Sequence, residues 1–161
     1  MIKVDYLGNG IFQGHNGKKG IKIDPSHYSP VELFITGMAT CSAVDITELA
    51  KGQGGNLKGL SMEVEYKRRD TYPKIFTEFH FIYKIEAEVE EIKAKRWVLS
   101  SLETYCSTIN TVRATSKIYY SIYLNGNPIA YRETILSGGG EAKLESFDDD
   151  LEGLGCACCN S

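Results

Sequence analysis

One stretch constrains this chain more than any other: a helix with a well-defined start that begins after Ser29 and runs to about Lys51. Pro30 suits the first helical position, where no backbone N–H is needed. The side chains of Ser29 and Glu32 are spaced to accept hydrogen bonds from each other's backbone N–H groups, a pattern called a capping box. The apolar positions that follow cover more than half of the circumference, which predicts a helix buried on several sides. They are Leu33, Ile35, Met38, Ala39, Ala43, Val44, Ile46, Leu49 and Ala50.

The five cysteines fall into two groups. Cys41 and Cys106 stand alone inside segments of regular apolar periodicity, whereas Cys156, Cys158 and Cys159 crowd the C-terminal end. An odd number of cysteines argues against a framework of static disulfides. Three sulfurs at a terminus cannot alone close a tetrahedral metal site. The terminal group therefore keeps three interpretations: ligands for a soft metal, a partner in disulfide exchange, or a reactive tail without a function.

Length and charge exclude several classes of protein. A chain of 161 residues favours one domain, and a net charge of −3 argues against nucleic acid as a partner. The sequence has no uninterrupted run of about 18 apolar residues, so no membrane partner or membrane span is expected. The first residues, 1–6, alternate apolar and polar types and lack the core of a signal peptide. We therefore expect a cytoplasmic protein, whose thiols stay reduced unless they are catalytic or redox-sensing.

The remaining periodicity predicts an α+β fold in which helices pack against antiparallel sheet. Three short strands with glycine turns are expected within residues 1–25, before the first helix. The later elements are strands 60–67 and 75–87, a helix 89–106 with a polar tail to 115, and a strand 118–124. His80 is assigned to the solvated face of its strand. We expect one domain over 1–136 and a flexible acidic tail with three cysteines over 137–161.

The chemistry rests on Cys41 and Cys106. If the apolar faces of their helices meet, the two thiols lie in one buried seam, and a disulfide needs Cα atoms within about 7 Å. A thiolate that attacks a peroxide becomes a sulfenic acid, and a second thiol then condenses with it to a disulfide. The alternative is that both are small apolar core residues, because free cysteines are commonly buried and no CxxC motif is present.

Two motifs resemble those of a known family. The segment 29–34 followed by 37–43 resembles the first-cysteine helix of the OsmC/Ohr family, and 103–106 resembles its second-cysteine helix. This resemblance covers about residues 1–125. It implies an OsmC-like fold of antiparallel sheets on two central helices in an intertwined homodimer. It also implies thiol-dependent reduction of organic hydroperoxides, with Cys41 attacking, Cys106 resolving, and an external dithiol or lipoyl-bearing protein as reductant. No cofactor and no metal are expected.

Two departures place the chain nearer a less characterised branch of that family. The peroxidase members carry an arginine in the N-terminal hairpin, whereas this chain has no arginine before Arg68. They also carry a carboxylate directly after the helix-start proline, where this chain has Val31. Glu32 comes one residue later, about 100° further round the helix, and is expected to orient a cation beside the thiolate. Candidate cations in the hairpin are His15, Lys18 and Lys19.

Two functions follow as hypotheses. The first is a peroxidase with an apolar substrate pocket lined by Phe34, Met38 and Trp97, which would favour alkyl hydroperoxides over hydrogen peroxide. The second is a non-enzymatic protein on the same scaffold that senses redox state or binds a small ligand, with peroxidase activity reduced because the arginine is missing. Loss of peroxide consumption on Cys41→Ser would support the first.

Overall fold

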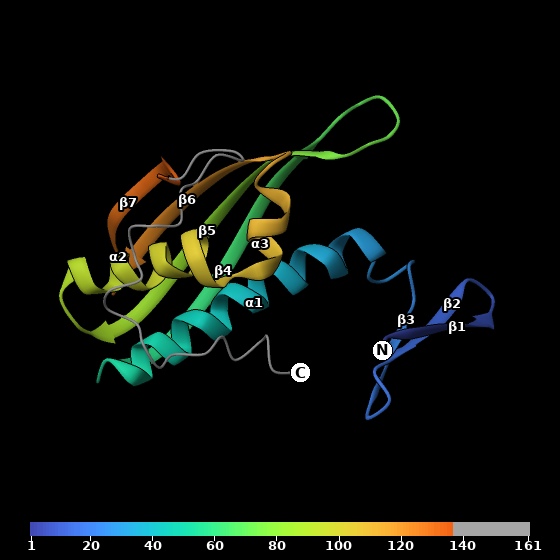
Figure 1. The fold of residues 1–161 in the computed structure, drawn as a ribbon, viewed down its shortest axis with the longest axis horizontal. Coiled ribbons are helices and arrows are strands. Elements are labelled where there is room, and N and C mark those ends of the chain that lie inside the picture. Colours follow the sequence, from blue (N-terminus) through green and yellow to red (C-terminus); the bar gives the residue numbers. More distant parts are fainter. Residues whose placement is uncertain (137–161) are drawn as a thin grey trace. The chain divides into compact units, whose positions relative to one another are not determined.

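The computed structural model describes residues 1–136, so the expectations for the tail and for Cys156, Cys158 and Cys159 lie outside the described residues. The chain divides into two compact units, Met1–Gly37 and Met38–Ser161 (Figure 1).

The first unit contains a three-stranded antiparallel sheet. Its strands β1 (Lys3–Gly8), β2 (Ile11–His15) and β3 (Gly20–Ile23) pair in the order β1-β2-β3, as the sequence predicted. Gly8 and Gly10 have positive φ angles, 94° and 75°, and so permit the tight turn between β1 and β2. The sheet buries little of its apolar surface: Ile2, Val4, Tyr6, Leu7 and Ile21 are all exposed.

Helix α1 (Pro30–Gly52) begins in the first unit with the predicted capping box. The Ser29 backbone N–H donates to Glu32 Oε2 over 2.7 Å, and the Glu32 N–H donates to Ser29 Oγ over 3.2 Å. The Ser29 hydroxyl also donates to Glu32 Oε2. These bonds satisfy N–H groups that the first helical turn leaves without intrahelical partners.

The second unit is built on a four-stranded sheet of order β4-β5-β6-β7. The strands are β4 (Asn56–Arg68), β5 (Phe76–Glu88), β6 (Lys117–Leu124) and β7 (Asn127–Thr134). The expected α+β class is correct, but the sheet is mixed, because β5 and β6 are parallel. A parallel pair needs a crossover, here α2 (Glu91–Ser100), the π-helix η1 (Ser101–Tyr105) and α3 (Ser107–Val112). Strand β7 was not predicted.

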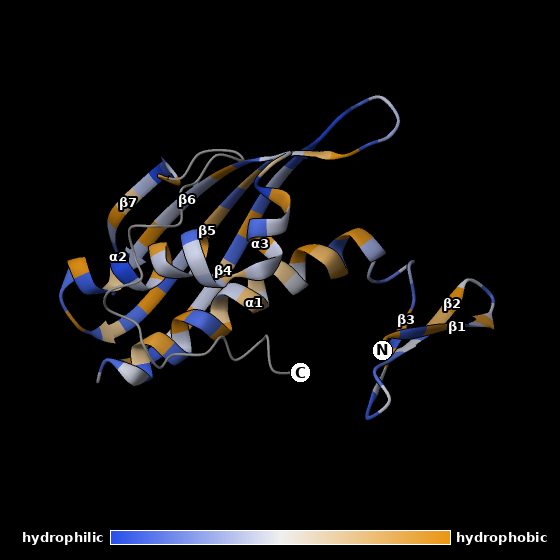
Figure 2. Cartoon of the chain, in the orientation of Figure 1, coloured by the Kyte–Doolittle hydropathy of each residue, from blue (hydrophilic) through white to orange (hydrophobic). Residues whose placement is uncertain are grey.

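One face of this sheet forms the core. Hydrophobic and hydrophilic residues alternate along its strands (Figure 2), and on β5 the inner residues Phe79, Phe81, Tyr83 and Ile85 are fully buried. Helix α2 packs against β6 and β7, and the buried side of α1 reaches β5 through a hydrogen bond between the hydroxyls of Ser42 and Tyr83. The helices therefore cover the face from which these apolar side chains project.

The expected solvation of His80 is wrong. The residue is on the other sheet face, as its place in the strand required, but it is buried. Its Nε2 lies 2.8 Å from Ser121 Oγ, and its Nδ1 lies 3.0 Å from Glu65 and 3.3 Å from Arg132 Nη1. Glu65 of β4, Ser121 of β6 and Arg132 of β7 lie against the ring and bury it. The apolar–polar alternation of a single strand cannot predict burial by residues of other strands.

Helix α1 is long and apolar enough to cross a membrane by length and composition, with a mean hydropathy of 1.3 in its best window. The sequence expectation of no span counted uninterrupted apolar residues, whereas this average tolerates polar ones. Ile46, Leu49 and Ala50 of α1 are buried inside the second unit. A core helix of a folded domain can have the same composition.

Candidate functional site

The site begins on α1. Cys41 and Asp45 are four residues apart, and residues at this spacing lie on the same face of a helix. Both side chains are buried. Asp45 was not among the site residues predicted from the sequence. The signal that could have identified it is an aspartate on an otherwise apolar helix face, one turn from a cysteine.

The second half of the site comes from a break between two helices. The predicted helix 89–106 does not continue to its end as an α-helix: the last turn is the π-helix η1, closed by the Cys106 N–H bonding to Ser101 O over 2.8 Å. Cys106 itself has an extended backbone (φ −69°, ψ 96°), and α3 starts at the next residue. Single π-turns of this kind are frequent at functional sites. The apolar residues keep their helical spacing through this segment, so the sequence does not predict that the helix is interrupted at Cys106.

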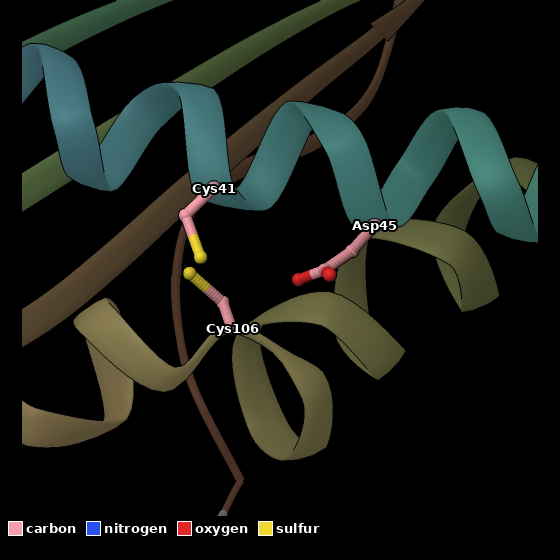
Figure 3. Close-up of side chains that lie close together, drawn as sticks. All are labelled: Cys41, Asp45 and Cys106. Carbon is pink, nitrogen blue, oxygen red and sulfur yellow. The ribbon is translucent and has the colours of Figure 1, made fainter. Parts of the chain in front are cut away.

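The two elements bring three polar side chains together (Figure 3). Cys41 Sγ, Cys106 Sγ and a carboxylate oxygen of Asp45 all lie within 4.8 Å of one another, and all three residues are buried. Both cysteines are reduced thiols. The expectation that two thiols far apart in sequence meet in a buried seam is therefore correct.

A chain of hydrogen bonds runs away from Asp45 through the core. The Ser101 hydroxyl donates to Asp45 Oδ2 over 3.0 Å, and its oxygen lies 2.8 Å from Ser42 Oγ. Ser42 Oγ in turn lies 2.9 Å from the Tyr83 hydroxyl. Burial raises the pKa of Tyr83 far above its usual value, so the phenol stays protonated and available as a donor. This network fixes the carboxylate of Asp45 beside the thiols.

The two sulfurs have different surroundings. Burial, with a smaller contribution from neighbouring Cys41, raises the pKa of Cys106 to about 12 despite the lowering effect of the Thr108 hydroxyl 3.3 Å away. Cys106 is therefore a neutral thiol near pH 7. Its side chain is fully buried, whereas Cys41 is 8% exposed. Cys41 is therefore the less deeply buried residue of the pair.

The predicted pocket is partly wrong. Trp97 is fully buried, and its indole N–H donates to Gln53 Oε1 at the far end of α1. Gln53 is 12 residues, or about 18 Å of helix, beyond Cys41, so Trp97 does not line a space at the thiols. Met38 contacts Cys106 through its backbone carbonyl, which lies 3.9 Å from Cys106 Sγ and accepts from that thiol, so the lining of an apolar pocket by its side chain stays a prediction. Phe34 belongs to the first unit and is exposed.

Glu32 also belongs to the first unit. Its carboxylate is held by Ser29, whose side chain and backbone hydrogen bonds keep the pKa of Glu32 below its usual value. These hydrogen bonds show that Glu32 caps the start of α1. Its expected second role, to orient a cation beside the Cys41 thiolate, stays a prediction.

The fold and the paired thiols define a class of α+β proteins in which a long central helix and a second helical segment each present one cysteine to the other. The chain belongs to the OsmC-like protein family, whose model matches residues 23–121. No curated protein matches the chain.

Solved structures share the fold. A hypothetical protein from Aquifex aeolicus VF5 is 25% identical over 77% of this chain and 96% of its own, with a TM-score of 0.69. An OsmC-like protein from Mycoplasma pneumoniae is 17% identical over 77% of this chain and 95% of its own, also with a TM-score of 0.69. An organic hydroperoxide resistance protein from Legionella pneumophila is 21% identical over 76% and 94%, with a TM-score of 0.55.

Proposed function

We propose that this protein is a thiol-dependent peroxidase that reduces organic hydroperoxides through a reversible Cys41–Cys106 disulfide. The observation that carries the proposal is the approach of the two reduced sulfurs to within 4.8 Å in a buried seam. Membership of a family that includes structures named as organic hydroperoxide resistance proteins supports the substrate class.

Accessibility assigns the two roles. Cys41, the less deeply buried residue of the two, attacks the terminal oxygen of the hydroperoxide, breaks the O–O bond and releases the alcohol. The resulting Cys41 sulfenic acid then meets Cys106, whose sulfur attacks it to form the disulfide and release water. Two thiols are oxidised and one peroxide is reduced. A small dithiol or a lipoyl-bearing protein restores both thiols by exchange.

A cation beside Cys41 would stabilise its thiolate. We propose that Glu32 orients such a cation, the role that the resemblance implies for it; its carboxylate accepts hydrogen bonds from Ser29 at Oε2. The candidates for this charge in the N-terminal hairpin are His15, Lys18 and Lys19.

We also propose that the protein works as a homodimer in the cytoplasm. The exposed apolar residues of β1–β3 give this thin sheet no core of its own among the described residues, and a second copy would cover them. A reducing compartment would return the thiols of the site to the reduced state that the proposed cycle needs.

One observation favours the non-enzymatic alternative, a redox sensor on the same scaffold. A carboxylate near a thiol disfavours the thiolate if both are charged, and Asp45 lies within 4.8 Å of both sulfurs. A slow-reacting Cys41 would form the disulfide without sustaining turnover.

The test uses the full chain with its terminal cysteines changed to serine, so that two thiols remain. Consumption of cumene hydroperoxide is measured with dihydrolipoamide as reductant, and the disulfide is identified by mass spectrometry as a loss of two hydrogens. We expect turnover in this protein and none in Cys41→Ser. In Cys106→Ser, one equivalent of peroxide should give a sulfenic acid that a dimedone probe traps.

The control is Thr111→Ala, which changes an exposed hydroxyl on α3. It should keep both the turnover and the disulfide. Stoichiometric disulfide formation without turnover would favour the sensor, and absence of a Cys41–Cys106 disulfide under peroxide would refute both functions.

A further inference from the structure

The three buried side chains in Figure 3 have a second chemical capacity besides disulfide formation. Two sulfurs and one carboxylate oxygen converge within 4.8 Å of one another, with two donors on one face of α1 and the third at the break after η1. Zinc binds cysteine sulfur at about 2.3 Å and carboxylate oxygen at about 2.0–2.2 Å. In a tetrahedral site, donors that share one ion are about 3.5–3.8 Å apart, so atoms that lie within 4.8 Å of one another reach that spacing by side-chain movements of up to about 1 Å.

The donor set selects the metal. Thiolates exclude Ca²⁺ and Mg²⁺, which take oxygen ligands, and a carboxylate disfavours Cu(I), which prefers sulfur alone. Zn²⁺ accepts a mixture of sulfur and oxygen. Three protein ligands also leave the fourth tetrahedral position open for water.

We propose that the reduced protein binds one Zn²⁺ ion through Cys41 Sγ, Cys106 Sγ and the carboxylate of Asp45. Binding releases the two thiol protons, so one divalent cation replaces two protons and the summed charge of the two sulfurs and the ion does not change. The exchange therefore avoids the cost of adding net charge to a buried site.

The surroundings support two of the three ligands, Asp45 and Cys106. Ser101 donates to Asp45 Oδ2 and orients the carboxylate, while the Thr108 hydroxyl lies 3.3 Å from Cys106 Sγ. Hydrogen bonds to ligands from the next layer of residues orient them and raise metal affinity. These contacts are present without a metal, so the carboxylate is already held in place.

Zinc binding and the disulfide exclude each other, because both use the same two sulfurs. The metal proposal does not depend on peroxidase activity, since it needs only reduced thiols. It replaces the sequence expectation of no metal, which considered the terminal cysteines and overlooked Asp45.

The experiment is a titration of the reduced full chain with Co²⁺ under anaerobic conditions, followed by displacement with Zn²⁺. The terminal cysteines are again changed to serine so that they contribute no signal. We expect one equivalent to give a thiolate-to-cobalt charge-transfer band in the near ultraviolet and intense tetrahedral visible bands, both removed by Zn²⁺.

Variants separate the ligands from the fold. Cys41→Ser should abolish the charge-transfer band or greatly weaken it. Asp45→Asn should keep the fold by circular dichroism but lower the Zn²⁺ affinity by at least about tenfold, the smallest effect of removing even an outer partner of a metal ligand. Glu48→Gln is the control, because it removes an exposed carboxylate from the same helix, and it should leave binding unchanged.

Two results would overturn the proposal: no cobalt band in the parent protein, or an affinity in Asp45→Asn equal to that of the parent. Peroxide turnover is measured separately on metal-free protein. Failure of metal binding therefore leaves the proposed peroxidase untouched, and loss of turnover leaves the metal site untouched.

Discussion

The buried ion pair between Glu103 and Arg113 should hold the helix break at Cys106 in place. Arg113 Nη2 donates to Glu103 Oε2 over 3.2 Å and to Leu102 O over 3.3 Å, so it ties the end of α3 to η1 on either side of the cysteine. Both side chains are at least nine-tenths buried. Leu136 N–H also donates to Glu103, over 2.5 Å.

Replacing Arg113 by Met keeps much of the side-chain volume but leaves the Glu103 carboxylate without this cation. Removing one partner of a buried pair typically costs about 3–5 kcal/mol. We expect about 3 kcal/mol here, the lower end of that range. Leu136 N–H still serves the carboxylate, and Arg113 Nε has no hydrogen-bond partner to lose among the described residues. Such a loss is a large share of the about 5–15 kcal/mol that stabilises a typical domain.

Urea unfolding of the reduced protein measures this loss of stability. The dependence of the unfolding free energy on urea concentration, m, should be the same in both proteins, because only then does a shift of the midpoint report stability alone. The double variant Arg113→Met with Glu103→Leu is the control: it removes both charges and should recover most of the lost stability. Arg113→Met should also slow formation of the Cys41–Cys106 disulfide, because Cys106 loses its anchored position. A cost below about 1 kcal/mol, or a double variant no more stable than the single one, would refute this reasoning.

Three further predictions concern packing, assembly and pH. Gly55→Ala should destabilise the protein by about 1–3 kcal/mol in urea unfolding, because the added Cβ would lie 2.4 Å from the ring of Trp97; a neutral result would contradict the packing. Tyr6→Glu should shift the protein from dimer to monomer in light scattering, because it charges an exposed apolar face; a dimer that tolerates it would argue for a different interface. The hydrogen bond from Lys95, and after it that from the Tyr120 hydroxyl, lower the pKa of Glu133 in the folded protein. The Glu133 carboxylate therefore stabilises the fold at pH values above its pKa in the unfolded chain, and this contribution is lost as the pH falls through its pKa in the folded protein. Lys95→Met should therefore flatten the loss of urea stability on acidification, and an unchanged profile would count against the pair.

Most helices and strands could be predicted from the sequence because their patterns depend on residues close together in the chain. The capping box at Ser29 and Glu32, the alternation of β5 and the glycine turn before β2 each depend on neighbouring residues, and each appears in the structure. The parallel pairing of β5 with β6 was beyond such signals, since it depends on which strands meet after a crossover.

The site was predicted in part for the same reason. The meeting of Cys41 and Cys106 followed from apolar helix faces that had to bury themselves. The π-turn and the break at Cys106 change the backbone but not the apolar pattern, so periodicity could not reveal them. The serine and tyrosine hydroxyls beside Asp45 come from α1, η1 and β5, and only the tertiary structure brings them together.

Cys106 lies in the segment of the chain that connects β5 to β6, and this position gives the proposed disulfide a measurable effect on stability. A bond from Cys41 on α1 would close a loop of roughly 65 residues that contains both β4 and β5, and the chain-entropy model assigns such a closure about 4 kcal/mol. The unfolded chain, rather than the native one, bears that restriction. The oxidised protein should then melt at a higher temperature than the reduced protein. The melting temperature of the protein in a cell extract would therefore show whether its disulfide had formed in the cell.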